Sequence, residues 1–457
     1  MMLQKLKQLK NWLPAALVAA TLGAGVWQNA AAAPATVIFV HGFMGFCEDE
    51  ALGYKYWGGL NDIPAQLRAA YPDMASYSVC VGPLSSNYDR AVELFWKIKG
   101  GCIDYGANHA ATHGHDRYFK NSAAARNTAD PRQCPSASST VVKNRAVYPA
   151  WDEAHPVHII AHSQGGQTAR MLAQLLSNGG VSPESDSNLF AGNAVNARWI
   201  KSITTISTPN DGTTLVNSIT DYVPFVQSLA AGLATFVGAN PLLTDFAYDF
   251  KLDQWDVPTK SSSESFSDYM YRVLNNNPKR IFTDRNVRDI STFDLSPDGA
   301  MRTNDWVQDQ ADHYYFSVST RSNTTGWISG WAYPRWDANP LIGLFCGPGF
   351  MGNFSSSGAP AIDNSWRDSD CVVPTRSQKA PTLKISRTAP LGTSSSARAT
   401  IIKDISGGAA PQKGAWNWKG TQDSFDHLDI VGWTLGWSST DKLNWYKAHI
   451  NQLRALP

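Results

Sequence analysis

The sequence VHIIAHSQGG, from Val157 to Gly166, decides the fold of this chain. An apolar run with β-branched residues that stops at a histidine, a serine and two glycines is typical of a buried strand of a parallel sheet. The next residues, QTARMLAQLLSN, place apolar side chains at helical spacing and end at Asn178. Ser163 is therefore predicted to lie on a sharp strand-to-helix turn, where its hydroxyl oxygen stands clear of the sheet.

The residues two positions before and after Ser163 are small, as so tight a turn requires. They are Ala161 and Gly165, whereas the nucleophile elbow of α/β-hydrolases usually has glycine at both positions. An ordinary strand-to-helix junction that happens to contain a serine is the alternative interpretation. The clean strand before Ser163 and the helix after it favour the elbow.

Three further segments have the pattern of buried strands. They are residues 36–43 (TVIFVHGF), 203–214 and 313–320. Strands that alternate with helices predict a mainly parallel sheet with helices on both faces. We therefore expect an α/β-hydrolase fold in a single domain over residues 33–457, which ends in an amphipathic helix at 439–456.

Composition and charge argue against some partners. The 457 residues are 43% hydrophobic and 17% charged, which is ample for a large core. The net charge is +1 and no basic patch emerges from the sequence. We therefore expect no nucleic acid as a partner, and the charge gives no argument for an anionic membrane surface.

The first residues have the three regions of a secretory signal peptide. MMLQKLKQLK is cationic, NWLPAALVAATLGAGV is apolar, and NAAAAP offers small residues for cleavage after Ala32. The apolar region is too short for a confident membrane span. We expect that residues 1–32 are removed and that the mature chain, without an integral membrane segment, is secreted to the medium or the periplasm.

Cysteines in an exported protein predict disulfides. The six are Cys47, Cys80, Cys102, Cys134, Cys346 and Cys371. We favour the pair Cys346 and Cys371, because this bond would brace the loop that carries Asp370. The alternative is that one or more of the cysteines are buried free thiols.

A serine nucleophile needs a histidine base and an acid that orients the base. Three histidines follow Ser163: His313 begins a strand, His449 lies on the C-terminal helix, where we expect it to be exposed, and His427 lies in the polar loop DSFDHLDIVGW. The order serine, acid, histidine favours His427 as the base. Asp370 in NSWRDSDCVVP is the favoured acid.

Asp368 remains open as the acid, because spacing does not separate it from Asp370.

The oxyanion formed in the attack needs two backbone N–H donors. We expect them from Gln164, which follows the nucleophile, and from Phe43 in HGFMG after the first strand.

Residues 222–244 contain no charged residue. Proline and glycine interrupt the segment at Pro224, Gly232, Gly238 and Pro241, which argues against a membrane span. A core helix and a mobile lid over an apolar cleft both fit this pattern.

The sequence HAATHGH contains His109, His113 and His115. A plain polar loop is one interpretation. Histidines near acids such as Asp89 and Asp104 also suit a borderline cation, most often zinc.

A set of motifs together resembles those of the thermoalkalophilic Bacillus and Geobacillus lipases and the related staphylococcal lipases. They are VHGFMG, YKYWGG, VGPLSSNYDRA, DYGANHAATHGH, IIAHSQGGQTARML, STPNDGTTLVN, YDFKLDQW and FDHLDIVG. The match runs over most of the mature chain. Residues 121–150 look like an insertion without a counterpart.

The resemblance implies roles for specific residues. The triad is Ser163, Asp370 and His427, and the oxyanion hole is formed by Phe43 and Gln164. A structural zinc ion is implied at Asp89, His109, His115 and Asp253, which leaves His113 as a bystander. The resemblance also favours a lid at about residues 218–244, beside a zinc subdomain contributed by about 85–118 and 245–256.

These lipases also bind calcium just past the catalytic histidine, partly through two acidic residues. Asp429 can stand in for the first, which is Glu in the thermophilic members, but Thr434 falls where the second should be. The resemblance therefore implies calcium only in part.

The sequence as a whole predicts a lipase, a secreted serine hydrolase that cleaves carboxylic esters of triacylglycerols at a lipid–water interface through an acyl-enzyme. A polyester-degrading enzyme or a short-chain carboxylesterase would use the same triad. A non-catalytic surface-binding protein on a hydrolase scaffold is the alternative from another class, and it is disfavoured because every triad member has a candidate.

Overall fold

The computed structural model describes most of the chain after residue 34. The described residues are 35–48, 50–119, 143–144, 146–185, 187–218, 222–236, 248–284, 286–357, 360–433 and 438–457. The predicted signal peptide, most of the predicted insertion and the end of the predicted lid lie outside them. None of the helices in the described part has the length and apolar character needed to cross a bilayer.

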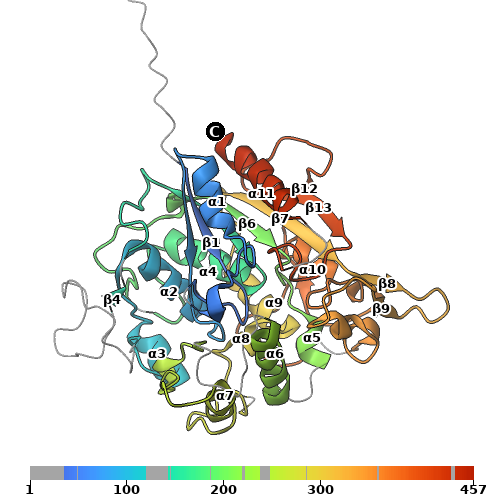
Figure 1. The fold of residues 1–457 in the computed structure, drawn as a ribbon. Coiled ribbons are helices and arrows are strands. Elements are labelled where there is room, and N and C mark those ends of the chain that lie inside the picture. Colours follow the sequence, from blue (N-terminus) through green and yellow to red (C-terminus); the bar gives the residue numbers. More distant parts are fainter. Residues whose placement is uncertain are drawn as a thin grey trace, which may run out of the picture. The chain divides into compact units, whose positions relative to one another are not determined.

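The central sheet has seven strands in the described residues, all parallel, in the order β12-β13-β7-β6-β5-β1-β2. Their bounds are β1 Thr36–Val40, β2 Ala75–Val79, β5 Val157–His162, β6 Ile200–Ile206, β7 Tyr314–Arg321, β12 Ile402–Asp404 and β13 Trp416–Asp423. Figure 1 shows these strands among the helices that cover the sheet. The predicted mainly parallel sheet is confirmed.

Three short antiparallel pairs lie outside this sheet. They are β3 Gly101–Cys102 with β4 Lys143–Asn144, β8 Asn323–Thr325 with β9 Ala332–Pro334, and β10 Leu383–Lys384 with β11 Ser396–Ala397. The helices are α1 Ile63–Ala70, α2 Asn87–Lys99, α3 Ala107–His113, α4 Gln164–Ser177, α5 Thr214–Ser218, α6 Tyr222–Phe236, α7 Phe266–Asn275, α8 Ser291–Asp294, α9 Pro297–Trp306, α10 Thr375–Lys379 and α11 Ser439–Arg454.

Both faces of the sheet are buried. Along β1, Val37 and Phe39 belong to one apolar cluster, whereas Ile38 and Val40 belong to another, because successive side chains of a strand point to opposite faces. The first cluster includes residues of α1 and α11, and the second includes residues of α2 and α4. Strands buried on both sides are continuous apolar runs, which explains the sequence of β5.

The register of the strands aligns their carboxyl ends. Ile38, Ile159, Ile203 and Tyr315 are direct neighbours across β1, β5, β6 and β7. The loops after these strands therefore leave one edge of the sheet, which is where functional sites of open parallel sheets form. The turn at Ser163 lies at this edge.

Some features differ from the sequence-based expectations. Strands β2, β12 and β13 are not among the predicted strands. β2 does alternate apolar residues with serine, but over only five residues. β12 has three residues, and β13 contains Lys419, Gly420 and a register shift after Trp418. The prediction that His449 is exposed is wrong. Helix α11 packs on the sheet, and the His449 side chain lies 2.7 Å from Thr204 Oγ1 and 2.9 Å from Lys419 Nζ.

Two disulfides are present among the described residues. They join Cys47 to Cys80 and Cys346 to Cys371. The predicted Cys346–Cys371 bond is therefore confirmed. It cross-links residues that are 25 positions apart, which restricts the unfolded chain and so favours the folded one.

The buried histidine of β5 predicts sensitivity to acid. Burial, followed by the charge of Lys201, lowers the pKa of His158 to about 3, whereas an unfolded histidine titrates at about 6.5. Below about pH 6.5 the unfolded state binds a proton at this histidine that the folded state does not bind. The free energy of unfolding therefore falls as the pH falls. Between about pH 7.5 and about pH 5, His158 should remove roughly 2 kcal/mol of the free energy of unfolding.

Urea unfolding at these two pH values checks this. His158→Gln should shrink the difference in the free energy of unfolding between them. An equal pH dependence in His158→Gln and the parent would contradict the assignment.

Candidate active site

Ser163 occupies a strained backbone position between β5 and α4. Its φ is 55° and its ψ is −131°, a conformation that few residues with a side chain adopt. Glycines make the turn sterically feasible: a Cβ at Gly165 would lie 2.5 Å from the Val40 carbonyl oxygen, and one at Gly42 would lie 2.6 Å from Ser163 Cβ. The sequence-predicted strand, turn and helix thus lift the Ser163 hydroxyl above the carboxyl edge of the sheet.

The structure brings Ser163, His427 and Asp370 together in one hydrogen-bonded chain. The Ser163 hydroxyl lies 2.9 Å from His427 Nε2, and the His427 Nδ1–H donates to Asp370 Oδ2 at 2.8 Å. All three side chains are buried. In this arrangement the imidazole can take the serine proton while the carboxylate holds its tautomer.

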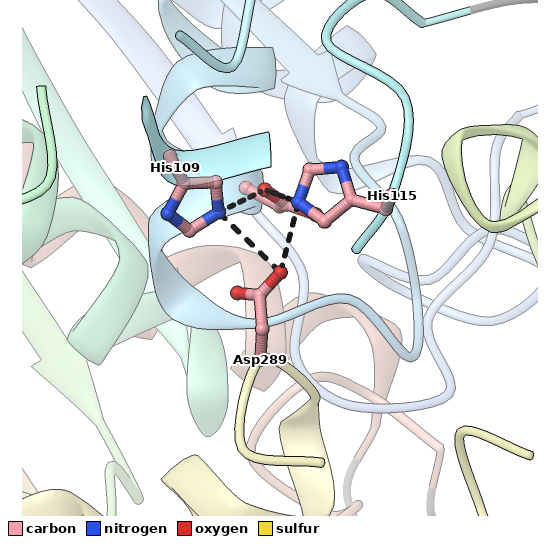
Figure 2. A group of neighbouring side chains, drawn as sticks. His109, His115 and Asp289 are labelled. Atoms are coloured by element: carbon pink, nitrogen blue, oxygen red, sulfur yellow. Dashed lines mark hydrogen bonds and ion pairs between the residues drawn. The ribbon is translucent and has the colours of Figure 1, made fainter. Parts of the chain in front are cut away.

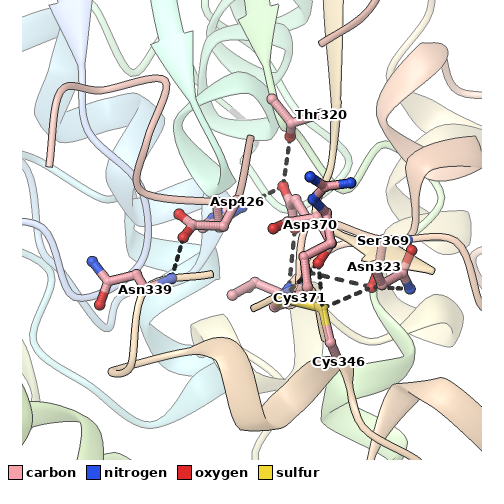
Figure 3. The surroundings of a disulfide bond; sticks show 12 residues. Thr320, Asn323, Asn339, Cys346, Ser369, Asp370, Cys371 and Asp426 are labelled. Carbon is pink, nitrogen blue, oxygen red and sulfur yellow. Dashed lines mark hydrogen bonds and ion pairs between the residues drawn. A yellow bond between two sulfur atoms is a disulfide. The ribbon is translucent and has the colours of Figure 1, made fainter. Parts of the chain in front are cut away.

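The carboxylate of Asp370 is held by several donors. Its Oδ1 accepts the N–H groups of Val372 and Val373 at 3.0 and 2.7 Å, and its Oδ2 accepts the Thr320 hydroxyl at 2.8 Å. The next residue, Cys371, has φ of 76° and forms the disulfide shown with Asp370 in Figure 3. The disulfide therefore anchors the turn that presents the acid.

The alternatives left open by the sequence lie elsewhere. Asp368 pairs with Arg321 at 3.3 Å, and its side chain is 47% exposed. His313 Nε2 donates to the Ala197 carbonyl at 2.6 Å. Asp370 and His427 are thus the acid and the histidine that geometry places beside Ser163.

Phe43, one of the two expected oxyanion donors, lines the same cavity as Ser163, and Gln164, the other, directly follows the serine. Phe43 lies in the turn after β1, and Gln164 is the first residue of α4. The Gln164 side chain is engaged elsewhere, with its Nε2 donating to the Ser85 carbonyl and its Oε1 accepting from Ser291. The first N–H groups of a helix have no partner within the helix, so α4 directs backbone donors to the position beside Ser163.

A second chain of hydrogen bonds joins the loop after β1 to the loop of His427. The Gly42 N–H donates to Tyr56 Oη at 2.9 Å, Tyr56 donates to His162 Nδ1 at 2.6 Å, and His162 Nε2–H donates to the His427 carbonyl at 2.9 Å. Burial, with the nearby His427, lowers the pKa of His162 well below its ordinary value. The neutral ring can therefore accept at one nitrogen and donate at the other. Sequence reasoning missed this chain, although Tyr56 belongs to the motif YKYWGG.

An apolar cavity of about 110 Å³ lies against Ser163 and His427. Its wall includes Met44, Leu295 and Val431. Helix α6 covers it: Phe225 and Leu229 line the cavity, and the Phe225 ring lies 5.3 Å from Phe345.

Helix α6 packs closely against the segment that contains Leu341. A Cβ at Gly232 would lie 2.2 Å from Leu341 Cδ1, so glycine permits this packing. The cavity beneath is smaller than the roughly 300–1,000 Å³ that is usual for ligand sites. Residues 237–244 of the predicted lid lie outside the described residues.

A second site is built from four buried side chains. Asp89, His109, His115 and Asp289 place one ligand atom each within 4.8 Å of one another. Figure 2 shows the two imidazoles and Asp289 converging on one point. His109 Nε2 lies 3.2 Å from Asp89 Oδ1, and His115 Nε2 lies 3.1 Å from Asp289 Oδ2.

The directions of the imidazole hydrogen bonds are compatible with a cation between the rings. The Nδ1–H groups of His109 and His115 donate outward, to Glu184 at 2.7 Å and to the Asp116 carbonyl at 2.8 Å. In neutral rings the Nε2 lone pairs then face the carboxylates. His115 Nε2 and Asp289 Oδ2 have no hydrogen-bond partner among the described residues. Tetrahedral ligands about 2.0–2.2 Å from one ion are spaced about 3.3–3.6 Å apart, so the group could hold a metal ion.

The expected fourth ligand, Asp253, is not part of this group, and Asp289 takes its place. The segment around Asp253 approaches the site through Gln254, whose side-chain Nε2 donates to Asp89 Oδ2 at 2.9 Å. Asp104 pairs with Arg117, and His113 faces Glu184 at 3.1 Å. Asp289 lies in a polar segment before α8 without any metal-binding motif, so the sequence offers no signal for it.

The partly implied calcium site has less support. Asp429 is buried, and its Oδ2 accepts the Asp426 N–H at 2.9 Å. Asp429 belongs to none of the metal-binding groups formed by the described residues. Thr434 lies outside those residues.

Comparison with known sequences places this chain among lipases. The family model described as "Lipase-like, C-terminal domain" matches residues 33–134 and 142–453. Lipase 2 of Staphylococcus aureus is 29% identical over 412 residues, which are 87% of this chain and 50% of that protein. Lipase 1 of the same species is 28% identical over 411 residues, with the same shares. The chain thus spans about half the length of the curated relatives it matches.

Solved structures agree with this. EstA from Clostridium botulinum superimposes with a TM-score of 0.73 at 34% identity, over 93% of this chain and 88% of that one. Lipase 1 from Pelosinus fermentans gives 0.71 at 35% identity, over 93% and 99%. Staphylococcus hyicus lipase gives 0.66 at 26% identity, over 92% and 95%. These matches confirm the resemblance to staphylococcal lipases that the motifs indicate.

The Tyr56 hydroxyl should control how well the site is held together. Tyr56→Phe removes the bonds to Gly42 and His162 and should slow the reaction of Ser163 with a fluorophosphonate about tenfold, because small misplacements of reacting groups are costly. The control is Tyr446→Phe, which also loses one buried hydroxyl bond, to the Ile430 carbonyl. Equal labelling rates in Tyr56→Phe and Tyr446→Phe would contradict the positioning role.

The metal-ligand assignment separates Asp289 from Asp253. Asp289→Asn should lower the affinity for the ion more than about a hundredfold, since even partners of metal ligands contribute up to that amount. Asp253→Asn should keep the metal. Metal content after dialysis, measured by mass spectrometry, decides between them, and loss of metal only in Asp253→Asn would restore the original expectation.

Proposed function

The chain belongs to the family of the lipase-like C-terminal domain, and from this premise we propose that it is a serine hydrolase that cleaves the carboxylic ester bonds of triacylglycerols. The observation that carries the proposal is the hydrogen-bonded chain of Ser163, His427 and Asp370 beside an apolar cavity. The names of its relatives, which are lipases, support the same reaction.

In the first half of the reaction, Ser163 Oγ attacks the ester carbonyl while His427 Nε2 takes its proton. Asp370 stabilises the resulting imidazolium through Nδ1–H. The backbone N–H groups of Phe43 and Gln164 stabilise the oxyanion, and one such donor contributes about 3 kcal/mol in comparable enzymes. His427 then protonates the leaving alcohol, and the acyl group stays on Ser163.

In the second half, water takes the place of the alcohol. His427 removes a proton from the water, which attacks the acyl-enzyme and forms a second oxyanion at the same donors. Collapse releases the fatty acid and returns the proton to Ser163. A general base of this kind accelerates each half by roughly a hundred- to ten-thousand-fold.

The walls of the cavity support an acyl chain as the bound group. The described residues that line it are largely apolar, and Ser163 and His427 are at its wall. Because the cavity is small, a long acyl chain requires α6 to move, which supports a lid at about residues 218–244 within a single catalytic domain over residues 33–457.

The metal is proposed to be zinc with a structural role. Two imidazole nitrogens and two carboxylate oxygens form a closed set of four, which zinc favours in structural sites. The ligands come from α2, from α3 and the turn after it, and from the segment before α8. The ion would neutralise the two buried carboxylates and cross-link these segments.

Secretion after removal of residues 1–32 is the proposed localisation. The disulfides Cys47–Cys80 and Cys346–Cys371 support it, because such bonds persist in oxidising compartments.

Release of fatty acid from emulsified triolein tests the proposed reaction. Ser163→Ala should abolish it, and Asp370→Asn should lower turnover about ten-thousand-fold through loss of the correct tautomer. Asp368→Asn is the matched control and should retain parent turnover. Comparable losses in Asp368→Asn and Asp370→Asn would contradict the assignment of the acid.

The same assay with p-nitrophenyl acetate addresses the alternatives. Turnover of the short soluble ester alone would keep the triad but change the function to short-chain carboxylesterase. Release that persists in Ser163→Ala would overturn the mechanism.

A further inference from the structure

A hairpin rich in exposed aromatic residues projects from the edge of the molecule that carries Ser163. It comprises residues 323–336, with strands β8 and β9, and we call it the aromatic hairpin. Figure 1 shows β8 and β9 reaching away from the sheet after β7. β8 begins two residues after β7 ends at Arg321, so the hairpin leaves the carboxyl edge of the sheet.

Large apolar side chains at the tip and at the end of the hairpin are exposed to solvent. Trp327 and Trp336 are each 92% exposed and Ile328 is 81% exposed, while Trp331 and Tyr333 are 40% exposed. Single exposed apolar residues are ordinary, but a group of this size on one element indicates an interaction surface.

The hairpin is held to the rest of the protein at several points. Ala332 in β9 is fully buried, and the Arg367 guanidinium donates to the Gly330 carbonyl, in the loop between the two strands, at 2.9 Å. At the base, the Arg335 N–H donates to the Ser322 carbonyl at 3.0 Å. The aromatic side chains are therefore presented by an ordered scaffold.

The segment that follows the hairpin forms part of the cavity. Leu341, Ile342 and Phe345 line it, whereas Leu344 between them is 74% exposed. The adjacent Cys346 is bonded to Cys371, next to Asp370. One continuous stretch thus carries the exposed aromatic residues at one end and the wall of the cavity at the other.

The small number of charged residues in the aromatic hairpin indicates which kind of surface it can bind. The hairpin contains one charged side chain, Arg335, which pairs with Asp337 at 3.1 Å. An uncharged apolar surface is therefore complementary to it, and an anionic one is not. Tryptophan has an apolar body and a polar N–H, and is enriched where apolar and aqueous phases meet.

We propose that the aromatic hairpin is the docking element of this protein for the uncharged surface of a triacylglycerol droplet. Trp327, Ile328 and Trp336 insert into the surface and hold the enzyme against it. This inference rests on the proposed lipase function and adds a substrate-binding surface separate from the triad and from α6.

Binding is tested in the Ser163→Ala background, so that the droplet is not consumed. The probe is triolein droplets coated with phosphatidylcholine, and bound protein is measured by flotation at low and high salt. Trp327→Ser, Ile328→Ser and Trp336→Ser combined should weaken binding at least about tenfold, with no effect of salt. The control combines Leu60→Ser, Leu391→Ser and Ile401→Ser, three apolar residues that are 60–75% exposed elsewhere on the protein, and should bind like the parent.

Turnover by the active enzyme separates this inference from the proposed function. The hairpin variant should cleave p-nitrophenyl acetate at the parent rate but need at least tenfold more droplet surface for half-maximal release from triolein. Normal droplet binding by the hairpin variant would overturn the inference, as would binding that requires anionic lipid. A parent that is dimeric by light scattering and becomes monomeric in the hairpin variant would assign the surface to a second copy and also overturn it. Droplet binding that depends on the hairpin, in an enzyme that cleaves neither ester, would support the docking element while refuting the proposed function.

Discussion

The backbone turn at Ser163 is the constraint on which the rest of the site depends. A residue with φ of 55° and ψ of −131° stores strain of about 1–3 kcal/mol, and the surrounding structure must hold it there. Strand β5 is buried along its whole length, and α4 begins immediately after the serine. The contacts at Gly42 and Gly165 bring the loop after β1 against the turn, so the expected oxyanion donors and the nucleophile are positioned by the same packing.

The same edge of the sheet carries buried polar groups that are stabilised in two different ways. Around Asp370, backbone N–H groups, the Thr320 hydroxyl and His427 supply enough donors that the carboxylate needs no ion. Around Asp289, the imidazoles direct their N–H groups outward to Glu184 and Asp116, so lone pairs converge. A buried carboxylate facing lone pairs is costly unless a cation lies between them, which is why the first site suits proton transfer and the second suits a metal ion.

The parts that the sequence could predict are those set by local chemistry. The strand, turn and helix around Ser163 follow from hydrophobic pattern and glycine, and the Cys346–Cys371 bond follows from the need to brace one loop. Asp289 could not be predicted, because it joins residues about two hundred positions away through tertiary packing alone. The prediction that His449 is exposed was wrong for the same reason. One face of α11 packs on the sheet, and the helical pattern of the sequence does not reveal which polar residue that packing covers. The bond from Tyr56 to His162 likewise depends on a contact between distant loops.

The loop between β7 and Asp370 joins the proposed docking element and the cavity wall to the acid in one covalent unit. It carries the aromatic hairpin, then the cavity wall at Leu341 and Phe345, and then Cys346, which is bonded to Cys371. Because both ends of the unit are fixed beside the triad, a large displacement of the cavity wall would disturb Asp370. Helix α6 touches this wall through Phe225 and Gly232 and carries no member of the triad. In the proposed lid movement α6 is therefore the element that opens the cavity, while the hairpin and the acid keep their positions relative to Ser163.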